Sequence, residues 1–141
     1  MPIMNYTTSV DAGKPLGEIQ CILTRHGARS IQVDYDQGEP EHVCFTLATP
    51  HGDRSFRLPA NIDGIQERLV EAFGPKSVRA THDQALRVGW RILKDWVEAQ
   101  VAIIEAGMVS TDEVMLPYML TPGGTTVYEA YEENELRLLN G

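Results

Sequence analysis

The most regular pattern of apolar and polar positions extends from Thr81 to Gly107 and predicts one long helix over about residues 82–106. Thr81 is a suitable N-cap with Gln84 completing a capping box, and Gly107 is a typical stop. One apolar stripe has helical spacing: Leu86, Trp90, Leu93, Val97, Ile104 and Met108. A second set broadens it: Val88, Ile92, Trp96, Ala99 and Ile103. Because so wide a stripe exceeds one buried face, we expect it to cover a sheet and also to contact a second copy of the chain.

Alternation with a period of two predicts three strands before that helix, over residues 30–36, 42–49 and 54–58. Turn residues at 36–40 and 50–53 separate them, so the strands should form a three-stranded antiparallel meander. Phe56 and Leu58 should face the core, whereas Ser55 and Arg57 should face away from it. The sequence therefore predicts an α+β fold with flanking short helices.

The remaining segments predict shorter elements. A helix should open at Pro15 and end at Gly27, and another should extend from an Asn61 cap to Phe73. Residues 113–120 contain Pro117 and favour an edge strand or a packed extended segment. Thr126 and Glu129 can form the capping box of a last short helix. The alternative is a hairpin that pairs residues 114–120 with 125–131. We expect residues 1–14 to be a flexible arm and residues 15–141 to be a single domain.

Composition limits the class of protein. The 141 residues are 43% hydrophobic and 23% charged, which is ordinary for a globular domain. No apolar run is long enough to span a bilayer and the N-terminus does not resemble a signal peptide, so we expect a cytoplasmic protein without membrane partners. The net charge of −8 disfavours non-specific binding to nucleic acid.

The cysteines and histidines do not form a metal-binding motif in the sequence. Two cysteines and four histidines occur without a CxxC or HxxxH spacing, so we expect no structural zinc site. Cys21 and Cys44 stand among apolar neighbours, which predicts buried, reduced thiols rather than a disulfide.

The segment RHGAR (25–29) matches the signature of the histidine acid phosphatases, in which the histidine is phosphorylated and both arginines bind phosphate. That family places the motif after a strand of a mostly parallel sheet. Here the motif closes a predicted helix and precedes an antiparallel meander. We therefore interpret His26 and Gly27 as a helix C-terminus, and with no complete catalytic set elsewhere we expect a protein that is not an enzyme and needs no cofactor.

Arginines are concentrated in the predicted sheet region, and planar guanidinium groups suit phosphate. A ligand-binding set follows from this: Arg25, His26, Arg29, Arg54 and Arg57, with Trp90 or Tyr118 stacking on a base. The alternative is ordinary surface arginines paired with Asp34, Asp36 or Asp53. For Trp90, a packed core or a dimer contact is the alternative.

Several strings carry a resemblance to known proteins: FRLPAN (56–61), WRILKDWVEAQ (90–100), IEAGM (104–108) and LPY (116–118). Over most of residues 16–131 the chain resembles a family of short proteins encoded by phages and prophages. The inferred architecture is also similar to the Thoeris anti-defence sponges, which sequester cyclic ADP-ribose signals in pockets between subunits. The resemblance implies a setting in an infected or lysogenic bacterial cell.

We therefore expect a phage-encoded, non-enzymatic, homo-oligomeric protein that sequesters a small phosphorylated ligand, such as a cyclic nucleotide or an ADP-ribose-type defence signal. One alternative is a single-stranded-DNA-binding or recombination accessory protein, using Arg54, Arg57 and Tyr35 along one groove. Another is a protein–protein inhibitor of a host defence factor, acting through the acidic C-terminal residues 129–141.

Overall fold

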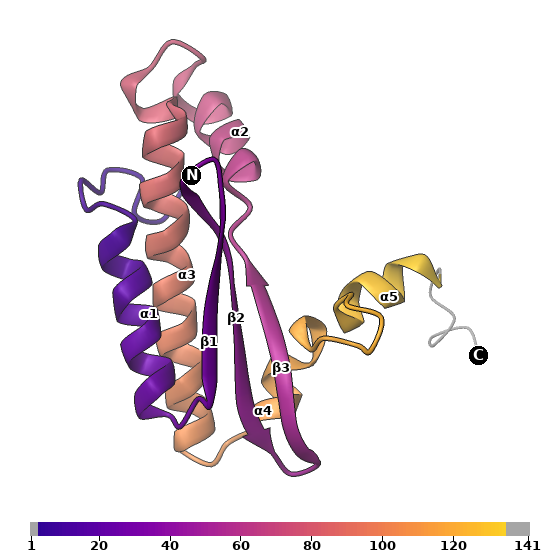
Figure 1. Ribbon diagram of the computed structural model, residues 1–141. Helices are drawn as coiled ribbons and strands as arrows, with labels where there is room; N and C mark the ends of the chain where they lie inside the picture. Colours follow the sequence, from indigo (N-terminus) through magenta and orange to yellow (C-terminus); the bar gives the residue numbers. More distant parts are fainter. Residues whose placement is uncertain (1–2, 135–141) are drawn as a thin grey trace. The chain divides into compact units, whose positions relative to one another are not determined.

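The computed structural model describes residues 3–134 and has an α+β fold (Figure 1). Its elements follow one another in this order: α1 (Gly13–Arg25), β1 (Ser30–Asp36), β2 (Glu39–Thr49), β3 (Gly52–Pro59), α2 (Ile62–Phe73), a 3₁₀ turn (Val78–Ala80), α3 (His82–Glu105), α4 (Thr111–Met115), a second 3₁₀ turn (Leu116–Tyr118) and α5 (Val127–Glu133). The long helix, the three strands and the helix after Asn61 confirm the sequence prediction. None of the helices in the described range is long and apolar enough to cross a membrane.

The chain divides into two compact units. The helical unit consists of Met1–Ile22 and Ala60–Val101, and the sheet unit consists of Leu23–Pro59 and Ala102–Gly141. α1 and α3 therefore belong mainly to the helical unit, and their last residues belong to the sheet unit.

In the helical unit, α1 and α3 lie side by side (Figure 1), and Lys94 Nζ of α3 is 3.3 Å from Glu18 Oε2 of α1. The buried side chains come from all three helices: Leu16 and Ile19 of α1, Leu69 of α2, and Val88, Trp90 and Val97 of α3. α2 approaches α3 closely at Gly89, where a Cβ atom would lie 2.7 Å from Ile62 Cδ1. Any side chain at this position would require the end of the Ile62 side chain to move.

The N-terminal segment that the sequence predicts to be an arm makes defined contacts with the helical unit. The side-chain Nε2 of Gln84 donates to the backbone oxygens of Tyr6 and Thr8, both at 2.9 Å. The Tyr6 ring stacks on Phe73. The Thr81 hydroxyl accepts from the Gln84 backbone N–H, as an N-cap does. The capping box predicted at this site is thus only half formed, because the Gln84 side chain binds the N-terminal segment instead.

In the sheet unit, β1, β2 and β3 are paired in sequence order and antiparallel. Gln37 and Gly38 both have positive φ values, as the two central residues of a type I′ hairpin turn require. Phe45 and Phe56 are paired and buried, with Val43, Leu47 and Leu58 on the same face. The opposite face, which we call the outer face, carries the polar residues, so the inward and outward positions predicted for β3 are confirmed.

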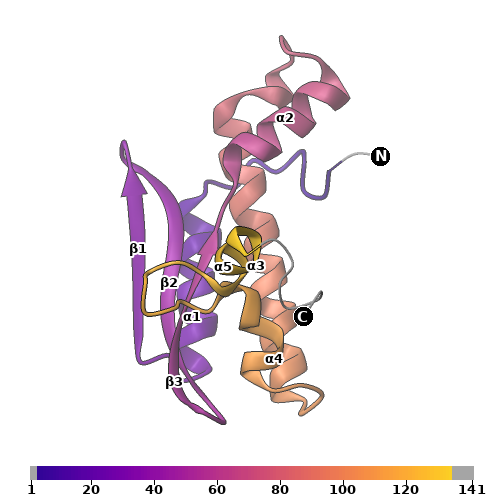
Figure 2. The same cartoon turned by 90° about the vertical axis from the view of Figure 1, so that its right-hand side faces the viewer.

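The C-terminal segment differs from the prediction. Residues 111–118 are helical, not an edge strand, because Ser110 and Glu113 form a capping box and Pro117 fits the first turn of a 3₁₀ helix. Only Met119 and Leu120 are extended, and the Leu120 N–H donates to the Ser55 backbone oxygen at 2.8 Å. Figure 2 shows this extended segment beside β3. Further along the chain, α5 begins with the predicted Thr126–Glu129 capping box.

Candidate functional site

Two of the predicted arginines each contact Asp53 at the end of the sheet where β3 begins. Arg29 Nε is 3.1 Å from Asp53 Oδ2, and Arg54 Nη1 donates to the Asp53 backbone oxygen at 2.9 Å. Their elements are brought together by β2, because the Arg29 N–H donates to the Thr46 oxygen and Arg54 is paired with Leu47. We call Arg29, Asp53 and Arg54 the basic end of the sheet. Both guanidinium groups belong to exposed residues.

The residues of the RHGAR segment lie where the sequence analysis placed them, at the end of α1. Gly27 has a φ of 96°, which is the left-handed conformation of a residue that terminates a helix. His26 Nδ1 lies 3.3 Å from Glu105 Oε2, so its ring is engaged by a carboxylate. Arg25 is exposed. This arrangement is that of a helix C-terminus, in agreement with the interpretation made from the sequence.

Arg57 lies apart from the basic end, on the outer face. Its Nη2 atom is 2.6 Å from Glu129 Oε1, and Nη1 donates to the Gly124 oxygen at 3.4 Å. Arg54 and Arg57 are three positions apart on β3, so their side chains leave opposite faces of the sheet. Arg57 therefore holds the C-terminal segment and does not join the other arginines.

The two aromatic residues predicted to stack on a base differ in exposure. Trp90 has 0% exposure, so it is a core residue and presents no ring face to a ligand. Tyr118 is half-buried in the 3₁₀ turn before Met119. The core alternative considered for Trp90 is thus the one that the structure favours.

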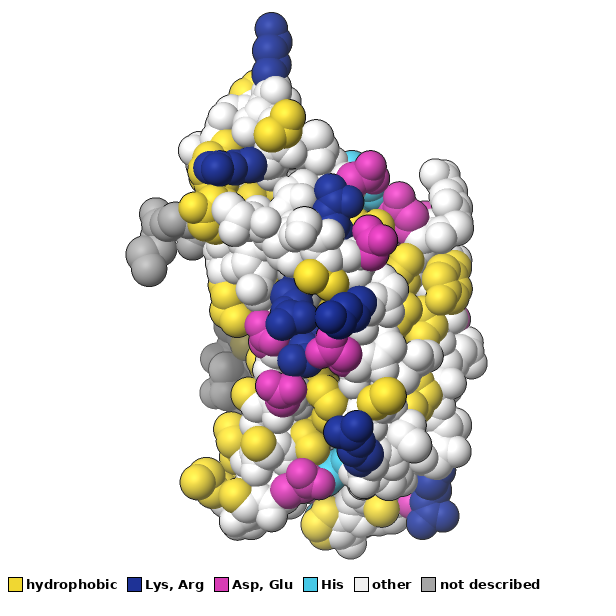
Figure 3. All heavy atoms as spheres, turned by 90° about the vertical axis from the view of Figure 1, so that its left-hand side faces the viewer, with side chains coloured by type: hydrophobic (Ala, Val, Ile, Leu, Met, Phe, Trp, Pro, Cys, Tyr) yellow, Lys and Arg dark blue, Asp and Glu magenta, His cyan; other side chains and the backbone are white. Residues whose placement is uncertain are grey.

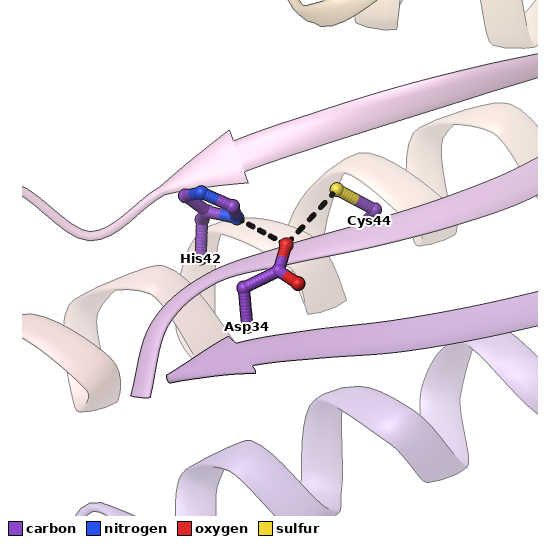
Figure 4. A group of neighbouring side chains, drawn as sticks. All are labelled: Asp34, His42 and Cys44. Carbon is purple, nitrogen blue, oxygen red and sulfur yellow. Dashed lines mark hydrogen bonds and ion pairs between the residues drawn. The ribbon is translucent and has the colours of Figure 1, made fainter. Parts of the chain in front are cut away.

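The outer face carries a second cluster that the sequence analysis did not identify. Asp34 on β1 lies opposite His42 on β2, and Cys44 is two positions further along β2. Asp34 Oδ2 is 2.9 Å from His42 Nδ1 and 3.8 Å from Cys44 Sγ. Figure 4 shows the carboxylate reaching from β1 toward both side chains. Alternation along strands places i and i+2 on one face, but the register of β1 against β2, which no local motif encodes, decides that Asp34 joins them.

The surroundings of this cluster are polar. Gln32 Nε2 donates to Asp34 Oδ1 at 2.8 Å, and Glu41 Oε2 lies 4.0 Å from His42 Nε2. Burial, together with the nearby Asp34 carboxylate, raises the pKa of the Cys44 thiol, and the Arg57 charge offsets part of that effect. Cys44 is half-buried, but Cys21 is exposed, so the prediction that Cys21 is buried was wrong.

A further group of charges lies on the helical unit. Figure 3 shows basic and acidic side chains mixed over α1 and α3. Lys94 Nζ is 3.3 Å from Glu18, 3.6 Å from Asp95 and 3.1 Å from Glu98, and Arg91 contacts Glu18 and Asp95. Because each cation in this group has a carboxylate neighbour, the group stabilises the packing of α1 on α3 rather than offering a free charge.

One hollow on the surface of α2 is open and acidic. Its lining is formed by Asp63, Gln66, Glu67, Val70 and Glu71. Three carboxylates make it unsuitable for a phosphorylated ligand, because like charges repel.

Comparison with protein-family models, curated proteins and solved structures found no match to this chain.

Proposed function

We propose that this protein binds a small phosphorylated ligand without chemically changing it, and that the ligand's phosphate lies at the basic end of the sheet. The observation that carries the proposal is that Arg29, which precedes β1, contacts the Asp53 carboxylate of β3 next to a second exposed arginine, Arg54. A cyclic nucleotide or an ADP-ribose-type signal is the ligand class that the sequence analysis favours.

The charge balance at the basic end supports an anionic ligand. Two guanidinium groups stand against one carboxylate, and within residues 3–134 Arg54 has a carbonyl partner but no carboxylate partner. Asp53 holds the Arg29 side chain in place, so part of its conformational entropy is already lost before a ligand binds. Each planar guanidinium group can donate two parallel N–H bonds to phosphate oxygens, so this end is better suited to bind phosphate than a single lysine would be.

The protein's acidity supports a small ligand over a long polyanion. With a net charge of −8, the chain as a whole repels nucleic acid, whereas a local pair of arginines still attracts one phosphate. The single-stranded-DNA alternative needs Arg54 and Arg57 in one groove, and their positions on opposite faces of β3 disfavour it. The inhibitor alternative depends on residues 129–141, of which 135–141 lie outside the described residues.

The proposal is tested first by purifying the protein from cells, denaturing it and searching for a released nucleotide by mass spectrometry. ADP-ribose and cyclic AMP are then titrated into the protein by calorimetry as defined probes. For the probe that binds, Arg29→Ala and Arg54→Ala should each weaken binding about 10- to 100-fold, because each removes a charge-assisted hydrogen bond worth about 1.5–3 kcal/mol.

Arg68→Ala is the matched control for these substitutions. Arg68 is an exposed arginine of α2 whose Nη1 lies 3.4 Å from Glu71. Its removal changes the net charge by the same amount but leaves the basic end intact, so binding should stay within about twofold of wild type. Unchanged affinity in both Arg29→Ala and Arg54→Ala would refute the proposed site.

A further inference from the structure

We propose that Asp34, His42 and Cys44 form a Zn²⁺ site on the outer face, with three protein ligands and a fourth position for water or a small ligand. This goes beyond the proposed function, because Cys44 and His42 lie on the outer face, three and five positions along β2 from Leu47, the residue paired with Arg54. The sequence predicts no zinc site because its cysteines and histidines lack closely spaced zinc motifs, whereas these ligands come from two paired strands.

The donor atoms are already near the separations that zinc requires. Each of the three residues offers one ligand atom, and the three atoms all lie within 4.8 Å of one another. Bond lengths of about 2.0–2.3 Å in a tetrahedron put neighbouring ligand atoms about 3.3–3.6 Å apart. The observed 2.9 Å from Asp34 to His42 and 3.8 Å from Asp34 to Cys44 bracket that range. Small side-chain rotations are therefore enough to coordinate the ion.

An independent observation comes from the imidazole of His42. Its Nδ1 atom is buried, and among the described residues it has no hydrogen-bond partner with acceptable geometry. The 2.9 Å contact with Asp34 Oδ2 is an ion pair and not a hydrogen bond. A buried ring nitrogen without a hydrogen bond loses free energy, and coordination of a cation by Nδ1 would restore it.

Neighbouring residues contact and orient the proposed ligands, as residues around metal sites do. Gln32 binds Oδ1 of Asp34 at 2.8 Å and leaves Oδ2 directed at His42 and Cys44. The Glu41 carboxylate is 4.0 Å from His42 Nε2 and adds a negative charge beside the cluster. Glu41 is the extra residue at an irregularity in the pairing of β1 with β2, because Asp34 pairs with His42 and Tyr35 with Pro40. Such bulges redirect side chains next to functional sites.

The ligand types select a borderline-soft divalent ion. Thiolate, imidazole and carboxylate together suit Zn²⁺, whereas Mg²⁺ and Ca²⁺ prefer oxygen ligands alone. As the Cys44 Sγ–zinc bond forms, the thiol proton is released to solvent. The bound ion's two positive charges are then balanced by the Asp34 carboxylate and the Cys44 thiolate. The neighbouring cation, Arg57, is paired with Cys44 across the strands and has its own carboxylate partner in Glu129.

Cobalt provides a direct test, because Co²⁺ substitutes for Zn²⁺ and is coloured. The full-length protein, freed of metal with a chelator, is titrated with Co²⁺ and its absorption spectrum is recorded. We expect one ion per chain, the visible bands of a tetrahedral complex, a thiolate-to-cobalt charge-transfer band, and loss of all these bands when Zn²⁺ is added.

Substitutions assign the ligands. Cys44→Ser should abolish the charge-transfer band, and Asp34→Asn and His42→Gln should each weaken Co²⁺ binding by more than about tenfold. Cys21→Ser is the matched control, because it removes the other cysteine, which is exposed and lies in the helical unit. Gln32→Leu should keep the band and weaken binding about tenfold, because it removes only the contact that orients Asp34.

A second measurement on the unaltered protein guards against variants that fail to fold. Zn²⁺ should slow alkylation of Cys44 and leave alkylation of Cys21 unchanged, as followed by peptide mass spectrometry. Arg29→Ala and Arg54→Ala should bind Zn²⁺ like wild type, which separates this site from the phosphate site. The proposal is overturned if folded wild-type protein shows no charge-transfer band, if Cys21→Ser removes the band, or if Zn²⁺ protects neither cysteine.

Discussion

At the scale of single residues, Lys94 shows how tertiary contacts override a local pattern. The sequence suggests a solvated strip of Lys94, Asp95 and Glu98 with a Lys94–Glu98 pair. The pair is present at 3.1 Å, but Lys94 has only 8% of its surface exposed and also contacts Glu18 of α1. A hydrogen bond to Glu98 is the largest of the effects that raise the pKa of Lys94, and burial opposes it. Lys94 is therefore a buried cation held by carboxylates from two helices.

We predict that Lys94→Met lowers the free energy of unfolding by about 1–2 kcal/mol, measured by urea denaturation. The buried hydrogen bonds are charge-assisted, but exposure of the Glu98 side chain screens part of their contribution. Lys76→Met, at an exposed position between α2 and α3, is the control and should be close to neutral. Equal stability of the two variants would mean that the Lys94 contacts contribute nothing to the fold.

At the scale of elements, the attachment of α5 depends on one carboxylate. Glu129 Oε1 accepts from the Thr126 N–H at 2.8 Å and from Arg57 Nη2 at 2.6 Å. The hydrogen bond from the Thr126 backbone is the main reason why the pKa of Glu129 lies below its usual value of 4.5, and the Arg57 charge adds to it. One side chain thus completes the cap of α5 and links this helix to β3.

This lowered pKa predicts acid sensitivity confined to α5. Because the folded state favours the ionised carboxylate, the stabilisation is present above pH 4.5 and is lost as the pH falls through the lower, folded-state pKa. We expect hydrogen-exchange protection factors of α5 amides to fall between about pH 5 and pH 3, while those of α2 change less. In Glu129→Gln the α5 protection should be lower at pH 5 and nearly independent of pH. Protection in α5 that is equally pH-dependent in both proteins would contradict this.

At the scale of the whole molecule, the long helix retains apolar surface. Several apolar side chains of α3 are only half-buried within the chain: Leu86, Ile92, Leu93 and Trp96. The width of this stripe is the reason for the predicted contact with a second copy, and burying it would add hydrophobic stabilisation of about 25 cal/mol per Å².

We predict that the protein in solution has at least twice the 15.7 kDa mass of the chain, measured by size-exclusion chromatography with light scattering. Leu93→Glu should shift it to the monomer, because a charge would be buried in the contact. Ala72→Glu, on the exposed surface of α2, should leave the mass unchanged. A wild-type protein that is monomeric at micromolar concentration would remove self-association through α3 from the proposal.

The elements and the faces of the strands follow from the amino-acid sequence, because they depend on interactions between residues close together in the chain. The 82–105 helix follows from periodicity and from caps at its ends, and the burial of Phe56 against the exposure of Ser55 follows from alternation. Helix 127–133 was predictable for the same reason, since the Thr126–Glu129 capping box spans only three positions.

Contacts between residues distant in the chain become visible only in the folded molecule. The burial of Lys94 and the contact of Arg57 with Glu129 involve partners distant in the chain, whereas the helical form of residues 111–118 follows from the local Ser110–Glu113 capping box. The same holds for both candidate sites. Arg29 contacts Asp53, and Asp34 contacts His42, only because strands paired in one register bring distant residues together, and a shift by one residue would separate them.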